Sequence, residues 1–297
     1  MNVKSLIHGA LTAYKGKPSE NMVPTFPQGK EIPRIIHQVF PSKVLPQELQ
    51  DNIEKIQALN PGWQYQLYDD QDMLDFIKEH YGAGLLEYYL QINPAYGAAR
   101  TDLFRYLLIY KTGGVYIDIK SSITRPLDDV LRADDVFLLA HWQNKTGEEF
   151  EGWGLSAELP PETQGEFQQW HVVAAPGHPF LRAVIKNVLT NISRYNPVLH
   201  GTGKYGVLRL TGPIAYTLAI QPALDKHKHR LINHPQELGF EYSIYRHQQG
   251  GTMNSHMAIF KSHYSTLVEP IIDLSLIDKL LVFILERVQA VRKMLKP

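Results

Sequence analysis

Apolar and polar positions along the chain follow two different periods, and their order predicts alternating strands and helices. The segment Ile32–Phe40 is rich in β-branched residues and contains prolines only near its ends, and Trp63–Tyr68 alternates as a strand does. Apolar residues recur at helical spacing over Pro46–Asn60 and Met73–Tyr81. Strand, helix, strand and helix in succession predict an α/β fold with a doubly wound, mostly parallel sheet.

The next helix is predicted to begin at Ala98 and to end at Gly113 and Gly114, because glycine adopts left-handed backbone conformations without a steric clash. Asp102 and Arg105 lie three residues apart and therefore face the same side of this helix. An exposed ion pair at this spacing contributes roughly a few tenths of a kcal/mol, so the pair alone does not indicate a function.

A strand is predicted directly after the two glycines, from Val115 to Lys120. Its period of two places Tyr116, Asp118 and Lys120 on one face, so a phenol, a carboxylate and an ammonium share one strand end. In doubly wound sheets, ligands bind beyond the carboxyl ends of the strands. We therefore expect the site at the ends of this strand and of Ile32–Phe40.

The later part of the chain predicts strands at Val136–Ala140 and His171–Ala175 and a helix at Pro179–Tyr195. The tripeptide Thr211-Gly212-Pro213 predicts the start of another helix, because proline suits the first helical turn. Residues 143–170 show no period and contain several glycines and prolines. A loop of this length in a compact domain is usually functional or disordered.

Three parts are predicted in the chain: an N-terminal extension over residues 1–30, one α/β domain over residues 31–272 and a C-terminal amphipathic helix over residues 273–297. The last helix combines an apolar stripe with a basic far end. A helix of this kind can make peripheral contact with an anionic membrane surface. It can equally pack on its own domain or on a second subunit.

Composition excludes several functional classes. The 30 basic and 30 acidic residues cancel, so the overall charge of a general nucleic-acid binder is absent and no nucleic-acid partner is predicted. The chain has no cysteine, which excludes disulfides, thiolate metal sites and a cysteine nucleophile, while 13 histidines leave other metal ligands open. Glycine-rich phosphate loops and the Gly-x-Ser-x-Gly motif are also missing.

The sequence carries neither a signal-peptide pattern nor an uncharged apolar run of the ~20 residues that span a bilayer. These features predict a cytoplasmic protein. If the C-terminal helix contacts a membrane, the protein is expected to be peripheral on its inner face.

Several motifs in order along the chain resemble glycosyltransferase family 32, a family with an Asp-x-Asp motif in its sugar-binding region. Its members include fungal initiating mannosyltransferases and bacterial capsular and lipopolysaccharide enzymes. The Gly-Gly-x-Tyr-x-Asp segment at residues 113–118 carries most of this resemblance. The other matching features, in the range from Pro33 to His263, are Pro33–Gln38, Trp63, Tyr68-Asp69, Ala98, Asp102, Arg105, Pro176–Phe180 and Thr211–Pro213.

The resemblance implies a GT-A fold, which is Rossmann-like, and a retaining hexosyltransferase. The donor would be a UDP- or GDP-sugar carrying a hexose or acetamidohexose, and the acceptor a glycan or a lipid-linked sugar in polysaccharide biosynthesis. Two other interpretations remain open. One is a non-catalytic protein of this fold that binds sugar nucleotides or glycans, and the other is an effector that glycosylates a protein.

The resemblance also implies roles for individual residues. In the family, the equivalents of Asp102 and Arg105 contact the donor sugar, and a planar guanidinium suits that role. Ala98 and Tyr116 are predicted beside them. A polar residue at a strand end can also be satisfied by backbone groups alone. The strand residues predicted near the nucleotide are Ile36, His37, Gln38 and Val39.

One departure from the family pattern lies at Lys120, because the Asp-x-Asp motif here reads Asp118-Ile119-Lys120. In the family the two carboxylates help to hold Mn²⁺ or Mg²⁺, which neutralises the diphosphate leaving group. Asp118 and Lys120 are the predicted catalytic residues, and three explanations of the lysine remain open.

In the first explanation, Asp118 still binds the cation with a histidine such as His263 or His256, and Lys120 touches phosphate. In the second, the Lys120 ammonium replaces the cation and Asp118 binds the ribose. In the third, the site binds sugar nucleotides without catalysis. A solvent-exposed lysine at a strand end is the structural alternative.

The long irregular loop and its start carry side chains suited to a sugar acceptor. Aromatic rings pack on the apolar faces of sugars, and amides bind hydroxyls. Trp142, Asn144 and Trp153 are therefore predicted to contact the acceptor. The alternative is that the tryptophans anchor the loop to the core.

Overall fold

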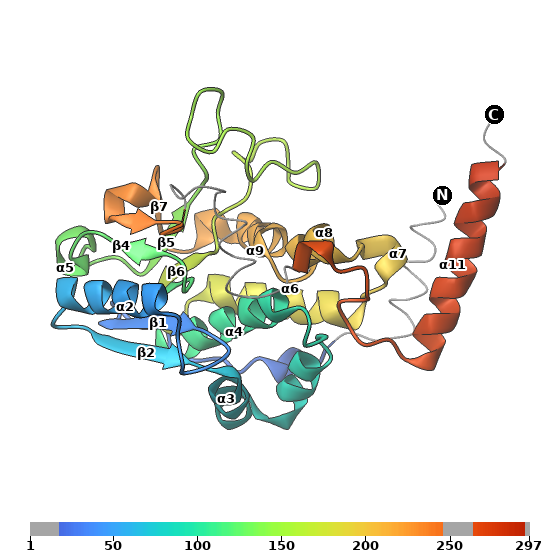
Figure 1. Cartoon of the computed structure of the whole chain (residues 1–297), viewed down its shortest axis with the longest axis horizontal. Helices are drawn as coiled ribbons and strands as arrows, with labels where there is room; N and C mark the ends of the chain where they lie inside the picture. Colours follow the sequence, from blue (N-terminus) through green and yellow to red (C-terminus); the bar gives the residue numbers. More distant parts are fainter. Residues whose placement is uncertain (1–17, 246–263, 295–297) are drawn as a thin grey trace.

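The computed structural model of the protein describes residues 18–245 and 264–294, and a six-stranded sheet lies at its centre (Figure 1). The strand order is β2-β1-β3-β6-β5-β7. Strand β6 runs antiparallel to both neighbours, whereas the other strands share one direction. The strands of this sheet are β1 Ile35–Val39, β2 Gln64–Tyr68, β3 Gly114–Ile117, β5 Phe137–Ala140, β6 His171–Ala174 and β7 Arg230–Ile232.

Helices cover both faces of the sheet, because each face is apolar. One face packs against α3, α4, α6, α8 and α9, and the other packs against α2, α5 and a two-stranded sheet of β4 Ser122–Ile123 and β8 Phe240–Glu241. The predicted α/β class and doubly wound, mostly parallel sheet are confirmed. The helices are α2 Gln47–Leu59, α3 Asp70–Leu90, α4 Gly97–Thr112, α5 Leu127–Val130, α6 Pro179–Ser193, α7 Pro197–His200, α8 Gly203–Leu210, α9 Pro213–Ile220 and α11 Leu276–Met294.

Two predicted elements have different ends in the structure. The helix expected over Met73–Tyr81 is longer, since α3 continues to Leu90 and bends at Gly82, whose φ is 79°. The strand expected to reach Lys120 is shorter, and this prediction was wrong. Strand β3 ends at Ile117 because Asp118 begins a turn, closed by a 2.8 Å hydrogen bond from the Ser121 N–H to the Asp118 carbonyl.

Helix α4 and strand β3 run in opposite directions around the glycine turn, an arrangement that we call the α4–β3 hairpin. It determines how far along the strand direction the charged residues lie. From Arg105 to the turn at Gly113 the helix rises ~12 Å, and from Gly114 to Asp118 the strand rises ~13 Å. The two side chains therefore return to the same level at the carboxyl edge of the sheet. Strand β6 begins at this edge too, because its first residue, His171, pairs with the last residue of β3.

The hairpin turn requires glycine for two separate reasons. Gly113 has a φ of 67°, which L side chains rarely adopt. A Cβ atom there would also lie 2.6 Å from Cδ of Pro176 and 2.7 Å from Cδ of Pro33. The turn is thus a point where three separate segments of the chain approach each other closely.

Helix α11 stands away from the sheet and its covering helices and approaches the domain near α7 (Figure 1). Its helical class agrees with the prediction for the C-terminal segment, with ends at Leu276 and Met294. Among residues 18–245 and 264–294, no helix combines the length and apolarity needed to cross a bilayer.

Replacing Gly113 with alanine tests the close approach at the hairpin. Gly82→Ala is the matched control, because Gly82 has nearly the same backbone conformation but open space around its Cβ position. The backbone strain of about 1–3 kcal/mol is common to both variants. We expect Gly113→Ala to lose a further ~1–3 kcal/mol of unfolding free energy in urea titrations, because the added methyl group overpacks the turn. Equal losses would contradict the close packing.

Candidate active site

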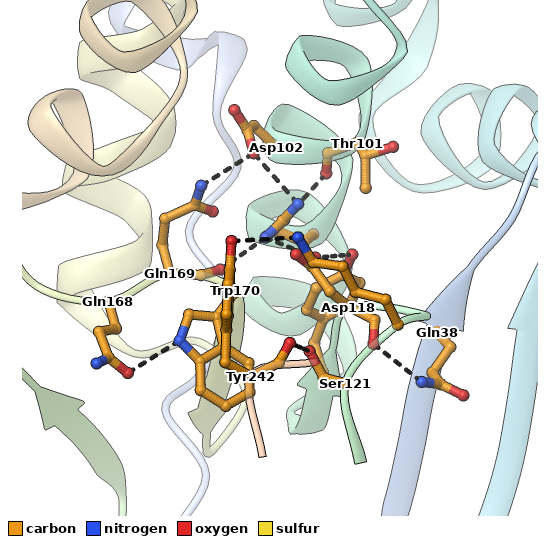
Figure 2. Close-up of polar contacts among 12 residues, drawn as sticks. Gln38, Thr101, Asp102, Asp118, Ser121, Gln168, Gln169, Trp170 and Tyr242 are labelled. Atoms are coloured by element: carbon orange, nitrogen blue, oxygen red, sulfur yellow. Dashed lines mark hydrogen bonds and ion pairs between the residues drawn. The ribbon is translucent and has the colours of Figure 1, made fainter. Parts of the chain in front are cut away.

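Arg105 of α4 lies at the centre of the polar cluster at the carboxyl edge of β3. Figure 2 shows its partners Asp102, Asp118 and Gln169. Its guanidinium is 3.2 Å from Oδ1 of Asp102 and 3.1 Å from Oδ1 of Asp118, and it donates a 2.7 Å hydrogen bond to the carbonyl of Gln169. It also lies 4.7 Å from the ring centre of Tyr116. Burial acts to lower the pKa of Arg105, but the surrounding negative groups outweigh it and raise the pKa, so the guanidinium stays charged.

Asp102 is almost fully buried and has a partner at each oxygen. Besides Arg105, Gln169 donates a 3.1 Å hydrogen bond to its Oδ1, and the Thr211 hydroxyl donates a 2.9 Å bond to its Oδ2. Burial raises the pKa of the Asp102 carboxyl, while these three partners act to lower it. Burial has the larger effect, so the pKa of Asp102 is raised overall.

Asp118 is the more exposed of the two carboxylates, with 23% of its side chain accessible against 5% for Asp102. The Tyr116 hydroxyl donates a 3.2 Å bond to the same Oδ1 that faces Arg105. The Asp118 backbone is fixed as well, since its N–H donates to the Trp170 carbonyl and its own carbonyl accepts from Gln38. Its remaining exposed surface can face a ligand.

Lys120 lies half-buried in the turn after Asp118 and extends toward Tyr242. Its Nζ atom donates a 3.1 Å hydrogen bond to the Tyr242 hydroxyl and lies 4.4 Å from the centre of that ring. Burial acts to lower the pKa of Lys120, but Tyr242 and Asp118 outweigh it and raise the pKa. The ammonium is therefore a fixed positive charge beside the Asp118 carboxylate.

The strand segment predicted near the nucleotide is buried in the sheet. His37 is 1% exposed and Gln38 is fully covered, while the apolar side chains of Ile36 and Val39 belong to the core. The His37 ring is hydrogen-bonded to the Gly113 carbonyl and the Tyr68 hydroxyl, and burial lowers its pKa to about 4, so it is neutral at pH 7. These side chains brace the edge of the sheet rather than point out of it. Their place near a nucleotide stays a prediction.

The long loop is irregular, as predicted, and its aromatic residues form a cluster with Tyr242. Trp142 and Trp153 lie 5.3 Å apart between ring centres, and both meet Tyr242 nearly at right angles. Trp142 is also held by a hydrogen bond to Glu166, whereas Trp153 remains 48% exposed. Asn144 donates its hydrogen bonds to carbonyls within the loop, at Trp153 and Gln164. Trp142 and Asn144 therefore anchor the loop, and Trp153 retains an open surface.

Four residues of the cluster were not singled out from the sequence as site residues. Gln169 and Trp170 precede β6, Tyr242 follows β8, and Thr211 belonged to a motif whose role was not assigned. Ala98, which was singled out, lies in the first turn of α4. No local pattern indicates Gln169, because its contacts depend on the antiparallel direction of β6.

The residues described here do not fit a bound divalent cation. The one exposed carboxylate, on Asp118, is already paired with a guanidinium, and the second position of the motif carries the ammonium of Lys120. Within residues 18–245 and 264–294 there is no group of three histidine, aspartate or glutamate side chains placed to hold a metal. The histidines proposed as further ligands, His256 and His263, lie outside the described residues.

The central residues of the cluster, Asp102, Arg105 and Asp118, lie in a segment that matches a known protein family. Residues 46–138, about a third of the chain, match the family described as "Glycosyltransferase sugar-binding region containing DXD motif". The match includes α4, the glycine turn, β3 and the Asp118-Ile119-Lys120 segment. The predicted resemblance to these glycosyltransferases is confirmed over this region. The DXD description indicates divalent-cation dependence in the family in general, and in this chain Lys120 stands at the second aspartate position of the motif.

Particular relatives are fungal mannosyltransferases. The chain is 28% identical over 180 residues to inositol phosphoceramide mannosyltransferase 3 of Schizosaccharomyces pombe, covering 59% of this chain and 44% of the relative. It is 34% identical over 105 residues to mannosyl phosphorylinositol ceramide synthase SUR1 of Saccharomyces cerevisiae, covering 35% and 27%. The chain thus spans less than half the length of these relatives. Among solved structures, the PaToxG glycosyltransferase aligns over 94% of each chain with 16% identity and a TM-score of 0.48, too low to support an inference.

Removing the charge at Arg105 tests whether it holds the cluster together. We expect Arg105→Met to lower the unfolding free energy by about 3–5 kcal/mol, because two carboxylates are left without their buried cation. Arg34→Met is the control, since Arg34 pairs with Asp128 at the exposed surface and the loss should stay within ~1 kcal/mol. Urea denaturation of both variants measures the difference, and similar values would contradict a central role for Arg105.

Proposed function

We propose that the protein is a retaining glycosyltransferase that transfers a hexose or acetamidohexose from a UDP- or GDP-sugar to a glycan or lipid-linked acceptor. The observation that carries this proposal is the Asp102–Arg105–Asp118 cluster inside the matched sugar-binding region. The cluster is held at the carboxyl edge of an α/β sheet, where ligands bind in such folds. The names of the fungal relatives favour mannose as the sugar and a lipid-linked acceptor.

The residues of the cluster divide into two groups by exposure. Asp118 and Lys120 are the more accessible, and we assign them to the donor itself, the carboxylate to hydroxyls and the ammonium to phosphate. Asp102 and Arg105 are nearly fully buried. We assign them to the inner wall of the donor-sugar site. A charged frame that is already fixed before the donor arrives needs little reorganisation during transfer.

The acceptor is assigned to the loop of residues 143–170. Trp153 offers an exposed ring next to the Lys120–Tyr242 pair, and aromatic faces pack well on sugars. Both ends of this loop start at the same sheet edge as Asp118, since Ala140 ends β5 and His171 begins β6. Donor and acceptor would therefore meet above the carboxyl end of β3.

The proposed activity is tested by measuring product formation. The donors are UDP-, GDP- and TDP-sugars, and the acceptors are sugar alcohols, glycans and lipid-linked sugars. We expect Asp118→Asn to lower the rate by about 100-fold, because a fixed charge at the donor is lost while the shape is kept. Asp134→Asn is the control, since Asp134 pairs only with Lys228 at the exposed surface. A variant Asp118→Asn with unchanged turnover would remove this residue from the site, and sugar binding without any product would favour a non-catalytic binder.

We propose that the C-terminal helix α11 binds the membrane that holds a lipid-linked acceptor. Its side toward the domain includes Leu285 and Asp278, each 5% exposed. The opposite side is an exposed apolar face, formed by Leu276, Ile277, Leu280, Phe283, Ile284 and Val288. Basic residues outnumber acidic ones in this helix and its end, and a basic amphipathic helix suits an anionic membrane surface. A cytoplasmic location, peripheral on the inner face of a membrane, belongs to the same proposal.

Vesicle co-sedimentation tests this surface of α11. We expect the double variant Leu280→Asp/Phe283→Asp to bind phosphatidylserine-containing vesicles at least ~10-fold more weakly, because two large side chains no longer enter the lipid. Glu286→Gln, at the polar side, should bind at least as well as the parent. If the double variant binds vesicles as the parent does, the apolar face does not contact the membrane. If the double variant instead loses a dimer that the parent forms in sedimentation, the apolar face packs between subunits.

A further inference from the structure

The turn that follows β3 is joined by backbone contacts to the segment carrying Tyr242. Strands β4 and β8 pair directly after the turn, with Ser122 opposite Glu241. The Ser121 hydroxyl donates a 2.8 Å hydrogen bond to the Tyr242 carbonyl, and the Ile244 N–H donates a 2.9 Å bond to the Lys120 carbonyl. Tyr242 is thus fixed to the turn on both sides (Figure 2).

The Tyr242 ring is held from several directions by other aromatic rings. Its centre lies between 5.2 and 6.3 Å from those of the neighbouring rings, and each meets it nearly edge-on. Its hydroxyl and ring together contact Nζ of Lys120. An ammonium held both by a hydroxyl and by a ring face loses much of its freedom to move. The rings around Tyr242 are those of Trp142, Phe150, Trp153 and Trp170.

The site holds two cations before a donor binds. Arg105 is paired with Asp102 and Asp118, and Lys120 contacts Tyr242. Among the described residues, the Lys120 ammonium donates a hydrogen bond to the Tyr242 hydroxyl alone, and an ammonium has three N–H donors. An incoming diphosphate therefore meets a fixed cation with donors to spare, where the DXD pattern would place a metal-binding carboxylate.

Resting on the proposed function, we propose that the donor site works without a bound divalent cation, and that Tyr242 is a positioning residue that aims the Lys120 ammonium at the donor diphosphate. In the transfer, the bond between the anomeric carbon and the diphosphate oxygen breaks with its electron pair on that oxygen. The acceptor hydroxyl oxygen bonds to the anomeric carbon, and the hydroxyl proton passes to the departing diphosphate. Lys120 neutralises the charge that develops on this leaving group.

This inference extends the site to the long loop. The ring that holds Lys120 is itself held by Trp142 and Trp153, so the loop assigned to the acceptor also supports the group that meets the leaving diphosphate. A change in the loop can then alter donor affinity without any contact between loop and donor.

Titration calorimetry of the full chain with UDP and GDP tests the inference without knowledge of the acceptor. For the nucleotide that binds more tightly, we expect the dissociation constants measured in EDTA and in Mn²⁺ to agree within about twofold. Lys120→Met should weaken that binding at least ~10-fold, because a charge-assisted contact to phosphate is lost, and should leave binding of the matching nucleoside unchanged. Lys78→Met, at an exposed position on α3, is the control.

Two further variants separate positioning from simple structural support. Tyr242→Phe keeps the ring but loses the hydroxyl, and should weaken diphosphate binding about threefold, with the melting temperature and nucleoside affinity kept. Lys120→Asp restores the Asp-x-Asp pattern and should make binding at least ~10-fold tighter in Mn²⁺ than in EDTA. If Tyr242→Phe reduces nucleoside and diphosphate binding equally, its role is structural only.

The possible failures are distinguishable. If the parent protein binds UDP or GDP only with Mn²⁺, the cation-free site is wrong while the proposed transferase function stands. If the folded protein binds neither nucleotide under any condition, the proposed function itself fails. Because the comparison of EDTA with Mn²⁺ uses the parent protein, it does not depend on whether a variant folds.

Discussion

A buried guanidinium must be paired, and at Arg105 this requirement fixes the relative positions of a helix, a strand and the segment before a second strand. The Arg105 side chain contacts the Asp102 carboxylate of α4, the Asp118 carboxylate at the end of β3 and the carbonyl of Gln169 before β6. Any slip of one element against the others would leave a charge without its partner in the interior, which costs several kcal/mol. The geometry of the site is therefore a consequence of how the charge is satisfied.

The same edge is stiffened by neutral contacts. His37 fills the space beside the glycine turn and its ring is bonded to the Gly113 carbonyl, so a Cβ on Gly114 would lie 2.9 Å from its Nε2 atom. His37 and Gln38, which were predicted from the sequence to lie near the nucleotide, both bond to backbone carbonyls. In the interior of a protein, polar side chains mostly satisfy the backbone.

Local sequence was sufficient for the hairpin and for the Asp102–Arg105 pair, because helical spacing and a glycine turn act over a few residues. It also gave most of the strands and helices of the sheet. It could not give the end of β3, where a backbone turn overrides alternation at Asp118. Nor could it give Gln169, Thr211 or Tyr242, whose contacts span 67 to 122 residues and depend on the order of the strands. Lys120 stood out in the sequence only as a departure from a family pattern. The structure adds its contact with Tyr242, on which the proposed role of Lys120 depends.

The antiparallel direction of β6 in the six-stranded sheet has one further consequence, for variation among related proteins. Because β5 ends and β6 begins at the same edge, the intervening residues form one excursion that leaves and re-enters the sheet beside Asp118. Insertions or deletions in that excursion change neither strand order nor register. The residues between β5 and β6 can therefore change as a unit among related proteins, while the charged residues at the end of β3 stay in place.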